Sequence, residues 1–316
     1  MKHTFAILLT MLMILCAVVS ACAEPVRVIA LQGPTGIGMV RMMKNNNGAY
    51  DFTMTAAPDE AVAAIVSGSA DIAAVPTNLA AVLYNRTAGG IRMLGLNTLG
   101  VLYILEKGNT IQNVADLAGK TVLATGQGAT PEYVLNYILA ANGLKESVTV
   151  EYRSEHAELA TLAAAGLADI VLLPEPHVTA VLMKNPDFRI ALDVTELFGQ
   201  AAEQRGENAL LSMGCVIANT AFIHNNPEAV EQFMLEYRES VEFVNADPEA
   251  ASLLVQQFGI MPKAEAVRRA IPNCHIVLIE GTEMTEKIKP FFGILYSADP
   301  KSVGGNLPGD DLYYIR

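Results

Sequence analysis

A glycine-rich segment at residues 33–38, GPTGIG, lies between an apolar run and the expected start of a helix. Turns of this kind hold phosphate groups with backbone amides in nucleotide-binding proteins. Here the glycine order is GxxGxG instead of GxGxxG, Pro34 removes an amide donor, and no Lys-Ser or Lys-Thr pair follows. These departures argue against a nucleotide loop. Two interpretations remain: a turn whose glycines serve only the backbone geometry, or a ligand loop in which Pro34, Thr35 and Gly36 approach a polar group.

A second such segment, GQGATPEY, occupies residues 126–133. Thr130 is a favourable N-cap and the proline after it suits the first position of a helix, so the helix start is well specified. We expect Gln127, Gly128 and Thr130 to offer amides and a hydroxyl to an oxygen-rich group. Glu132 in the first helical turn suits the helix dipole, but it would weaken the binding of a full anion.

Two nine-residue segments repeat each other along the chain. Residues 68–76 read GSADIAAVP and residues 166–174 read GLADIVLLP, with five identities at a constant offset of 98 residues. Each has the pattern of a glycine that stops a helix, a buried strand, a proline and a further helix. Chance similarity between two alanine-rich units is one explanation. The other, which we favour, is two similar α/β lobes.

The residues that follow the two repeats are further candidates for ligand contact. They are Thr77 and Asn78 after the first copy, and Glu175 and His177 after the second. Ligands of open α/β sheets bind beyond the carboxyl ends of parallel strands, so we expect both loops to face a shared cleft. The alternatives are that Asn78 only caps a helix and that His177 is an ordinary surface residue.

No catalytic or metal-binding constellation is present in the sequence. The mature histidines are scattered, no HExxH or GxSxG motif occurs, and neither Cys215 nor Cys274 has a second cysteine at metal-ligand spacing. Ser154, Glu155 and His156 are adjacent, but neighbouring residues on one helix point apart. We therefore predict no enzyme activity, no cofactor and no metal. Both cysteines lie in mostly apolar surroundings and are expected to be free thiols, the alternative being a disulfide.

The net charge of the chain and the charges of its candidate loops limit the kinds of ligand that it can bind. The formal net charge is −12, which argues against nucleic acid because nucleic-acid binding needs basic patches. None of the candidate loops contains Lys or Arg. An anionic ligand would have to be held by amides and hydroxyls, with Arg41, Lys44 or Arg153 approaching from nearby. Otherwise the ligand is neutral, zwitterionic or cationic, and Glu175 is its counter-charge.

Strand and helix patterns alternate along the chain, which predicts an α/β fold with mainly parallel sheets covered on both faces. Two extended stretches, residues 97–105 and 210–218, are the expected crossings between the lobes, and Asn97 and Thr98 in the first complete the predicted ligand set. We predict a discontinuous lobe 1 at residues 24–98 plus 215–316 and a lobe 2 at residues 99–214. Two crossings make a hinge.

The first 22 residues have the features of an export signal: a short positive start, an apolar run and small residues at its end. The segment VSAC resembles a bacterial lipobox, in which Cys22 would carry a lipid and hold the protein at a membrane surface. ACA also fits ordinary signal-peptidase cleavage, which would release the protein. We expect an exported protein, on the outer face of the bacterial cell membrane as a lipoprotein or in the periplasm.

The chain resembles the solute-binding proteins of ABC importers, in the branch that binds sulfonates, nitrate, taurine and the pyrimidine precursors of thiamine. The resemblance rests on GPTG, on the two repeats, and most of all on DLAGKTVLATGQGATPEYVLNYILAANG at residues 116–143. It implies two Rossmann-like lobes of the type II periplasmic-binding fold. It also implies a monomer that captures a small polar solute and hands it to a permease with its ATPase, without chemistry.

The chain departs from the anion binders of this family in having no Trp, which puts sulfonate or nitrate itself in doubt. Two other functions stay open from the sequence. One is an enzyme on the same fold, of the pyrimidine- or menaquinone-pathway type, and the other is a signalling or adhesion lipoprotein.

Overall fold

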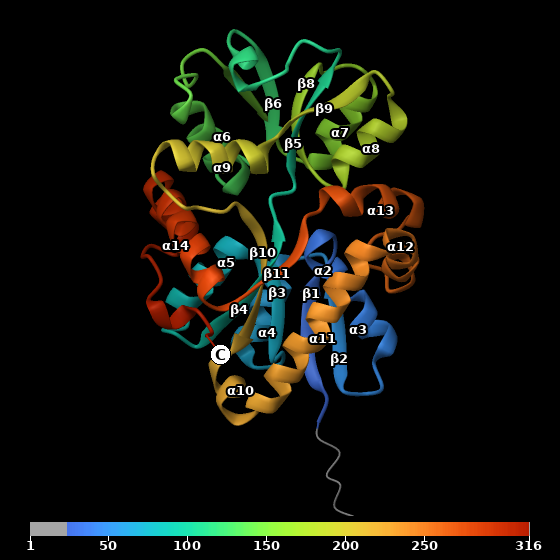
Figure 1. The fold of residues 1–316 in the computed structure, drawn as a ribbon, viewed down its shortest axis with the longest axis vertical. Helices are drawn as coiled ribbons and strands as arrows, with labels where there is room; N and C mark the ends of the chain where they lie inside the picture. The colour runs from blue at the N-terminus through green and yellow to red at the C-terminus, as the bar shows by residue number, and fades with distance from the viewer. Residues whose placement is uncertain (1–23, 316) are drawn as a thin grey trace, which may run out of the picture.

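The computed structural model describes residues 24–315, in two lobes stacked along the longest axis of the molecule (Figure 1). The predicted export signal and the lipidation site at Cys22 lie outside the described residues. Within residues 24–315, no helix is both long and apolar enough to cross a membrane. The chain is mixed α/β, as the alternating patterns predict.

Lobe 1, the lower lobe in Figure 1, is built on a six-stranded sheet with the order β11-β4-β10-β3-β1-β2. Its strands are β1 (Val26–Leu31), β2 (Tyr50–Thr55), β3 (Ile72–Pro76), β4 (Ile91–Leu99), β10 (Ser212–Asn219) and β11 (Ile276–Ile279). Its helices are α2 (Pro34–Ile37), α3 (Val40–Asn45), α4 (Pro58–Ser67), α5 (Thr77–Arg86), α10 (Thr220–Asn225), α11 (Pro227–Ala246), α12 (Pro248–Gln257), α13 (Ala264–Ala270) and α14 (Gly281–Ala298), with short 3₁₀ turns η2 (Ile271–Asn273), η3 (Pro300–Val303) and η4 (Asp310–Leu312).

Lobe 2 is built on a five-stranded sheet with the order β7-β6-β8-β5-β9. Its strands are β5 (Leu102–Lys107), β6 (Thr121–Thr125), β7 (Thr149–Arg153), β8 (Ile170–Pro174) and β9 (Phe188–Asp193). Its helices are α6 (Thr130–Ala141), α7 (His156–Ala164), α8 (His177–Lys184) and α9 (Val194–Gln204), with the 3₁₀ turn η1 (Val114–Leu117).

Both sheets are mixed, because the strands that enter from the other lobe run against their neighbours. β5 and β10 pair antiparallel with β8 and β3, while β1, β2 and β3, like β6, β7 and β8, run parallel. A strand that enters a lobe at its inner edge must run away from the other lobe. The parallel strands beside it therefore run toward the other lobe and end there, as the pairs Leu102–Pro174 and Gly214–Pro76 show.

The two repeated segments form the same unit. Gly68 and Gly166 both have a left-handed backbone, with φ of 73° and 72°, and each ends a helix before a strand and a new helix. In each lobe the strand of the repeat lies next to the strand that precedes it by two, giving β2-β1-β3 and β7-β6-β8. This supports two similar lobes over a chance match.

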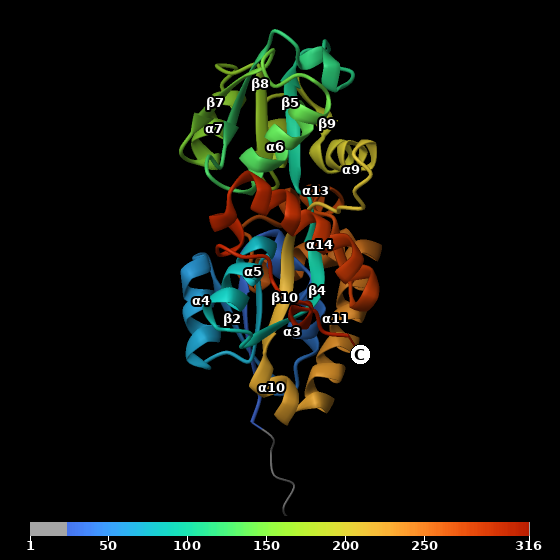
Figure 2. The ribbon, with the colours of Figure 1, turned by 90° about the vertical axis from the view of Figure 1, so that its left-hand side faces the viewer.

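The core of lobe 1 occupies both faces of its sheet. Val28 and Ala30 belong to a cluster on the side of α3 and α11, whereas Ile29 between them belongs to a cluster on the side of α4 and α5. Figure 2 shows these helices on opposite sides of the strands. Cys215 and Cys274 are both buried and free, as expected from their apolar surroundings.

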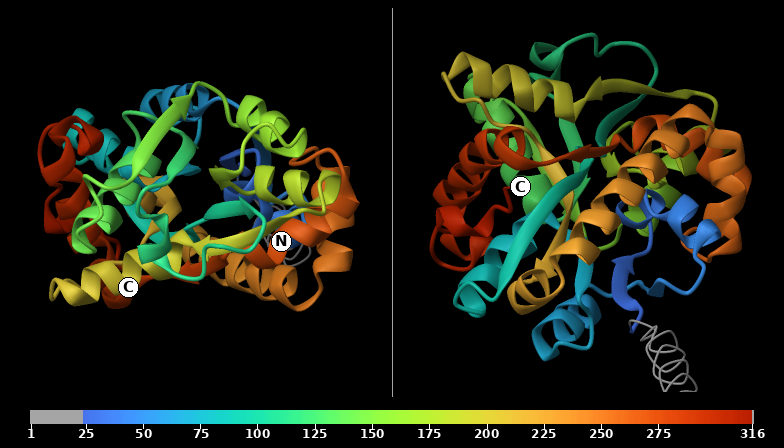
Figure 3. Two further views of the ribbon diagram at one scale, coloured as in Figure 1. Left: turned by 90° about the horizontal axis from the view of Figure 1, so that it is seen from above. Right: turned by 60° about the horizontal axis from the view of Figure 1, so that its bottom comes forward.

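The C-terminal part of the chain packs mainly on lobe 1. α11 and α12 contact α3, and the tail ends with Tyr314 donating its amide to the carbonyl of Met93 at 2.9 Å. α13 and α14 also reach lobe 2, where they contact α8 and α6, so the lobes touch on two sides (Figure 3).

Candidate functional site

The strand order selects the place where a ligand would bind. In lobe 1 the connections from β1 lead to β2 on one side and then across to β3 on the other, and lobe 2 repeats this pattern with β6, β7 and β8. The crevice at such a switch point is the usual ligand site of open α/β sheets. We call the four loops there the interlobe loops: residues 32–36 and 76–78 of lobe 1, and residues 126–130 and 175–177 of lobe 2.

In the segment at residues 33–38, Gly36 and Gly38 serve close packing, whereas Gly33 has open space around it and a positive φ of 89°. A Cβ on Gly36 would lie 2.5 Å from the carbonyl oxygen of Leu31, and one on Gly38 would lie 2.6 Å from the hydroxyl of Tyr237. Pro34, Thr35 and Gly36 form the single turn of α2, and the Thr35 carbonyl accepts a hydrogen bond of 3.0 Å from the Asn97 amide. The half-buried Thr35 side chain is the part of this loop that packing does not explain.

The other predicted residues of lobe 1 lie in its interior. Thr77, Asn97 and Thr98 are each at most 1% exposed. The Thr77 hydroxyl lies 2.8 Å from that of Ser212, and Thr98 donates to the Asn97 side-chain oxygen at 3.1 Å. This buried network fixes the carboxyl end of β3 against the start of β10.

Asn78, in the first turn of α5, donates its amide to the Ser302 carbonyl at 3.2 Å and so holds η3. The structure does not place its side chain as the cap of α5, the alternative that the sequence left open.

In lobe 2, the loop at residues 126–130 has already bound a carboxylate of its own. The Gly128 amide donates to Glu132 Oε2 at 2.6 Å, and the Gly128 carbonyl accepts from Tyr133 at 2.9 Å. Gln127 is exposed. Thr130 is buried as the first residue of α6 and Ala129 is the N-cap, so the prediction that Thr130 caps this helix is wrong. The amide that the sequence offers to an oxygen-rich ligand is therefore occupied by an internal one.

Two histidines meet at the carboxyl ends of β7 and β8. The rings of His156 and His177 lie 5.5 Å apart, each at the first position of its helix, and His156 Nδ1 lies 2.5 Å from the Thr125 hydroxyl. Burial lowers the pKa of both imidazoles, and His156 lowers that of His177 further. Both rings are therefore neutral near pH 7.

His156 was missed as a site residue, although a signal existed. It opens the helix after β7 just as His177 opens the helix after β8. The neighbours of His156 in sequence, Ser154 and Glu155, give no sign of its partner His177, which the sheet brings close to it.

Glu175 is a buried carboxylate at the end of β8. It is 3% exposed and accepts hydrogen bonds from the Thr179 amide at 3.0 Å, the Thr179 hydroxyl at 2.9 Å and the Asn273 amide at 2.9 Å. Burial raises its pKa, and no Lys or Arg pairs with it within the part of the chain that the structure describes. Since Asn273 belongs to lobe 1, this contact links the two lobes.

Among the described residues, none of the three cations that the sequence offered to an anion forms a hydrogen bond or ion pair with an interlobe loop. The Arg41 guanidinium lies 4.9 Å from the centre of the Phe243 ring, and Arg153 pairs with Glu151 at 3.4 Å. Lys44 lies in the last turn of α3, at the outer edge of lobe 1 (Figure 1).

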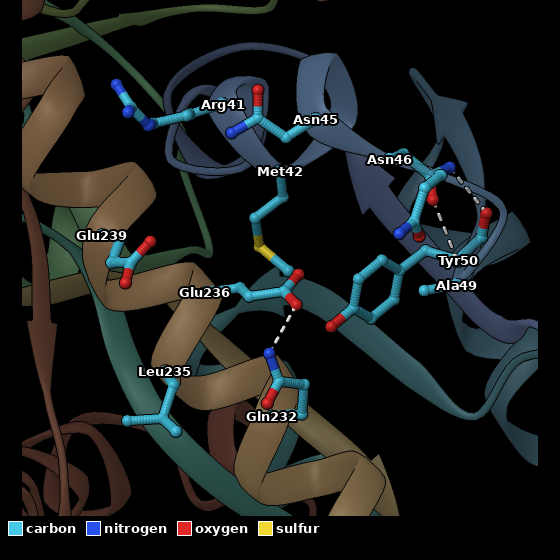
Figure 4. Close-up of a pocket in the computed structure, with 11 residues that line it drawn as sticks. Arg41, Met42, Asn45, Asn46, Ala49, Tyr50, Gln232, Leu235, Glu236 and Glu239 are labelled. Atoms are coloured by element: carbon cyan, nitrogen blue, oxygen red, sulfur yellow. Dashed lines mark hydrogen bonds between the residues drawn. The ribbon is translucent and has the colours of Figure 1, made fainter.

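A formed pocket of about 390 Å³ also lies at this outer edge (Figure 4). It is lined by α3, α11 and the start of β2, and includes Arg41, Tyr50 and Glu236. Gln232 donates to Glu236 at 2.7 Å, and Asn46 donates to the Tyr50 carbonyl at 2.8 Å. Because the pocket lies at the amino end of β2, opposite the switch point, it is not at the ligand site that the strand order selects.

Comparison with known proteins agrees with this architecture. Residues 96–251 match the family model described as NMT1/THI5 like. No curated protein matches the sequence. An ABC transporter from Parabacteroides distasonis superposes with a TM-score of 0.79 at 22% identity, covering 93% of this chain and 100% of that one.

Two further solved structures have the same fold. The periplasmic aliphatic sulphonate binding protein SsuA from Escherichia coli gives a TM-score of 0.66 at 17% identity, covering 90% of this chain and 96% of that one. The periplasmic nitrate-binding protein NrtA from Synechocystis PCC 6803 gives 0.54 at 13% identity, covering 83% and 75%. The protein thus has the type II periplasmic-binding fold, as the sequence predicted, and residues 96–251 are similar to the NMT1/THI5-like family.

Proposed function

We propose that this protein is the extracytoplasmic solute-binding component of an ABC importer. The observation that carries the proposal is the arrangement of the interlobe loops: each lobe ends its parallel strands at the other lobe, and the chain crosses between them twice. A solute at this place would touch both switch points at once. The similarity in fold to proteins named for sulphonate and nitrate binding supports the same role.

In this proposal the lobes close on the solute by a hinge movement at the two crossings. The moving bodies are residues 24–98 with 215–316, and residues 99–214. Ligand contacts to both lobes favour the closed state, which then docks on the permease and its ATPase. We propose that the protein is exported as a monomer. A lipid on Cys22 then holds it at the outer face of the bacterial cell membrane.

We propose that the ligand contacts come from the residues already predicted at the four loops. Thr35 and Gln127 are the best placed of these, because their side chains are not buried in the core of either lobe. The side chains of Thr77, Asn97 and Thr98 support the loops from below, whereas Glu175 and His177 lie at the lobe 2 switch point.

A thermal-shift screen of the mature protein tests this function. The panel contains sulfonates, oxyanions, pyrimidines, vitamins and amino acids. A true solute should raise the stability by about 3–4 kcal/mol at 100 to 1,000 times its dissociation constant. Thr35→Val should weaken that binding, and Ser67→Ala at the end of α4 is the matched control because it lies away from the interlobe loops.

The outcomes separate the candidate functions. Stoichiometric binding without loss of the solute supports capture. Turnover of a bound compound would instead make the protein an enzyme on the same fold. A folded sample that responds to no class would contradict solute binding.

A further inference from the structure

We infer that the solute carries no net negative charge and that it donates hydrogen bonds to the lobe 2 loops, where Glu175, His156 and His177 receive it. This inference rests on the proposed solute-binding function and names the chemical class of its ligand. It separates this chain from the fold relatives that are named for sulphonate and nitrate, both of which are anions.

The first argument is the occupied amide at Gly128. A helix start with free backbone amides is where an α/β protein holds an anionic oxygen. Here the Glu132 carboxylate accepts the Gly128 amide at 2.6 Å and brings its own negative charge to the loop. A sulfonate at this position would have to displace a hydrogen bond and approach a like charge.

The second argument is the buried carboxylate of Glu175. Buried charges in proteins are normally paired, and breaking such a pair is costly. Glu175 is satisfied only by neutral donors, namely Thr179 and Asn273. One of its donors comes from the opposite lobe, so a solute amine or amide N–H entering between the lobes would offer the same kind of donor as Asn273.

The third argument is the state of the histidine pair. A protonated pair would attract an anion, but burial lowers the pKa of both imidazoles, and His156 disfavours charge on His177 further. A neutral imidazole has one nitrogen that accepts and one that donates. Since Thr125 takes the Nδ1 side of His156, Nε2 of His156 and the nitrogens of the neutral His177 ring remain for an uncharged group.

The fourth argument is the position of the cations. Among the described residues, no Lys or Arg side chain forms a hydrogen bond or ion pair with any interlobe loop, and Arg41 and Arg153 are engaged elsewhere. Arg153 ends β7 beside Thr125, and its guanidinium is paired with Glu151. Glu132 and Glu175 of lobe 2 have no Lys or Arg partner among the described residues. Four separate features of one site thus disfavour the same class of ligand.

Three probes of nearly equal shape test the inference: benzoate, benzamide and benzamidine, which carry a negative, zero and positive charge. Ethanesulfonate and nitrate are added because they are the anions that the fold relatives suggest. Binding of each to the full mature chain is measured by calorimetric titration and thermal shift, at constant ionic strength. The same measurements are made on the hits from the solute panel, sorted by charge.

Four variants locate the effect. His156→Asn and His177→Asn should each weaken the neutral or cationic hits about tenfold, which corresponds to about 1.4 kcal/mol. Glu175→Gln should weaken benzamidine more than benzamide, because it removes the charge and keeps most of the shape. His224→Asn is the matched control, since His224 is exposed on α10 of lobe 1, and every variant is checked for an unchanged thermal transition.

The expected result is that benzamidine and benzamide bind more tightly than benzoate, and that nitrate and ethanesulfonate do not bind. Tighter binding of the anions would overturn the inference and leave the proposed function intact. If the neutral hits bind the histidine and Glu175 variants as tightly as the wild type, these residues do not recognise the solute. If neither the probes nor the panel binds, the proposed function fails, and the inference fails with it.

Discussion

At the level of single residues, several polar groups of the candidate site already have hydrogen-bond partners within the protein. The Gly128 amide is the clearest case, because the sequence presents it as a free donor and the structure gives it to Glu132. The pairing could be anticipated in part, because a glutamate in the first turn of a helix interacts favourably with the positive end of the helix dipole. Its reach back to the loop depends on the backbone bend at Gly126 and Gly128, whose φ values are 79° and 73°.

Replacing Glu132 by Ala should convert this loop into an anion site. The change frees the Gly128 amide and removes a negative charge, so ethanesulfonate should raise the melting temperature of the variant but not that of the wild type. The variant without ligand should lose about 0.3–1 kcal/mol from the helix dipole. Thermal unfolding in ethanesulfonate and in chloride at equal ionic strength measures both effects. Glu146→Ala, on the exposed surface of lobe 2, is the control, and an equal response in both variants would contradict the assignment.

The histidine pair makes a prediction about pH. Burial lowers the pKa of both rings from the ordinary value of about 6.5, so the unfolded chain binds protons more readily than the folded one below that pH. Stability should therefore rise with pH up to about 6.5 and fall as the pH is lowered through it. In His156→Asn, the pKa of His177 should move up, because one of the two causes that lower it has been removed. NMR titration of the ring protons measures this, and an unchanged or lower pKa would show that the rings do not interact.

At the scale of elements, the sequence predicted most of what positions the site. The repeat predicted two equivalent helix-strand-helix units, and the strands and helices after β1 and β6 are where the patterns placed them. α9, α10, β11 and α14 were not predicted from the sequence. In α14, Gly281, Pro290 and Gly293 interrupt the helical pattern of the sequence, and the helix packs on both lobes.

The pairing of His156 with His177 and of Glu175 with Asn273 could not be predicted from spacing along the chain. The first needs the order β7-β6-β8, which brings two helix starts to one crevice. The second needs η2, which the chain places 98 residues after Glu175 and on the other lobe. Contacts of this kind depend on how complete elements pack, and no local propensity encodes them.

The element η2 also supplies the polar contact that joins the lobes on the α8 side. Asn273 donates its amide to Glu175 at 2.9 Å, and its carbonyl accepts from Tyr103 at 2.9 Å. Asn273→Ala should remove the first bond, which is worth about 1.5–3 kcal/mol for a charged acceptor. Backbone amides of α8 and α13 should then exchange hydrogen faster, while those of α6 and α14 should not.

The control for this change is Asn142→Ala, because Asn142 donates only within its own helix end, to the Ile138 carbonyl at 2.9 Å. Tyr103→Phe should produce a smaller acceleration at the same amides. If Asn273→Ala and Asn142→Ala give the same exchange pattern, the bond does not hold the lobes together.

At the scale of the whole molecule, the two sides of the lobe contact differ in character. On the side of α9 and α14 the contact has an apolar centre, with a hydrogen bond from Tyr133 to Asp299 at 3.3 Å beside it. Phe198 and Phe291 are fully buried there with ring centres 5.7 Å apart, within a cluster that is continuous through both lobes. On the side of α8 and α13 it includes the polar bridge through Asn273. An apolar contact costs more to expose than a satisfied polar one, so we expect the lobes to separate on the α8 side and to pivot near α9 and α14.

If a solute is held between two moving lobes, the distance between a residue of lobe 1 and a residue of lobe 2 should change when the solute binds. Leu167 in lobe 2 and Leu253 in lobe 1 are exposed and can be replaced by Cys for spin labels, because the native Cys215 and Cys274 are fully buried. The distribution of distances between the labels is measured without solute and with a saturating hit from the panel. If the lobes close on the solute, the distribution of label distances should be broad without solute and should become narrower and shorter when solute binds. A distribution that stays the same while solute is bound would contradict capture between closing lobes.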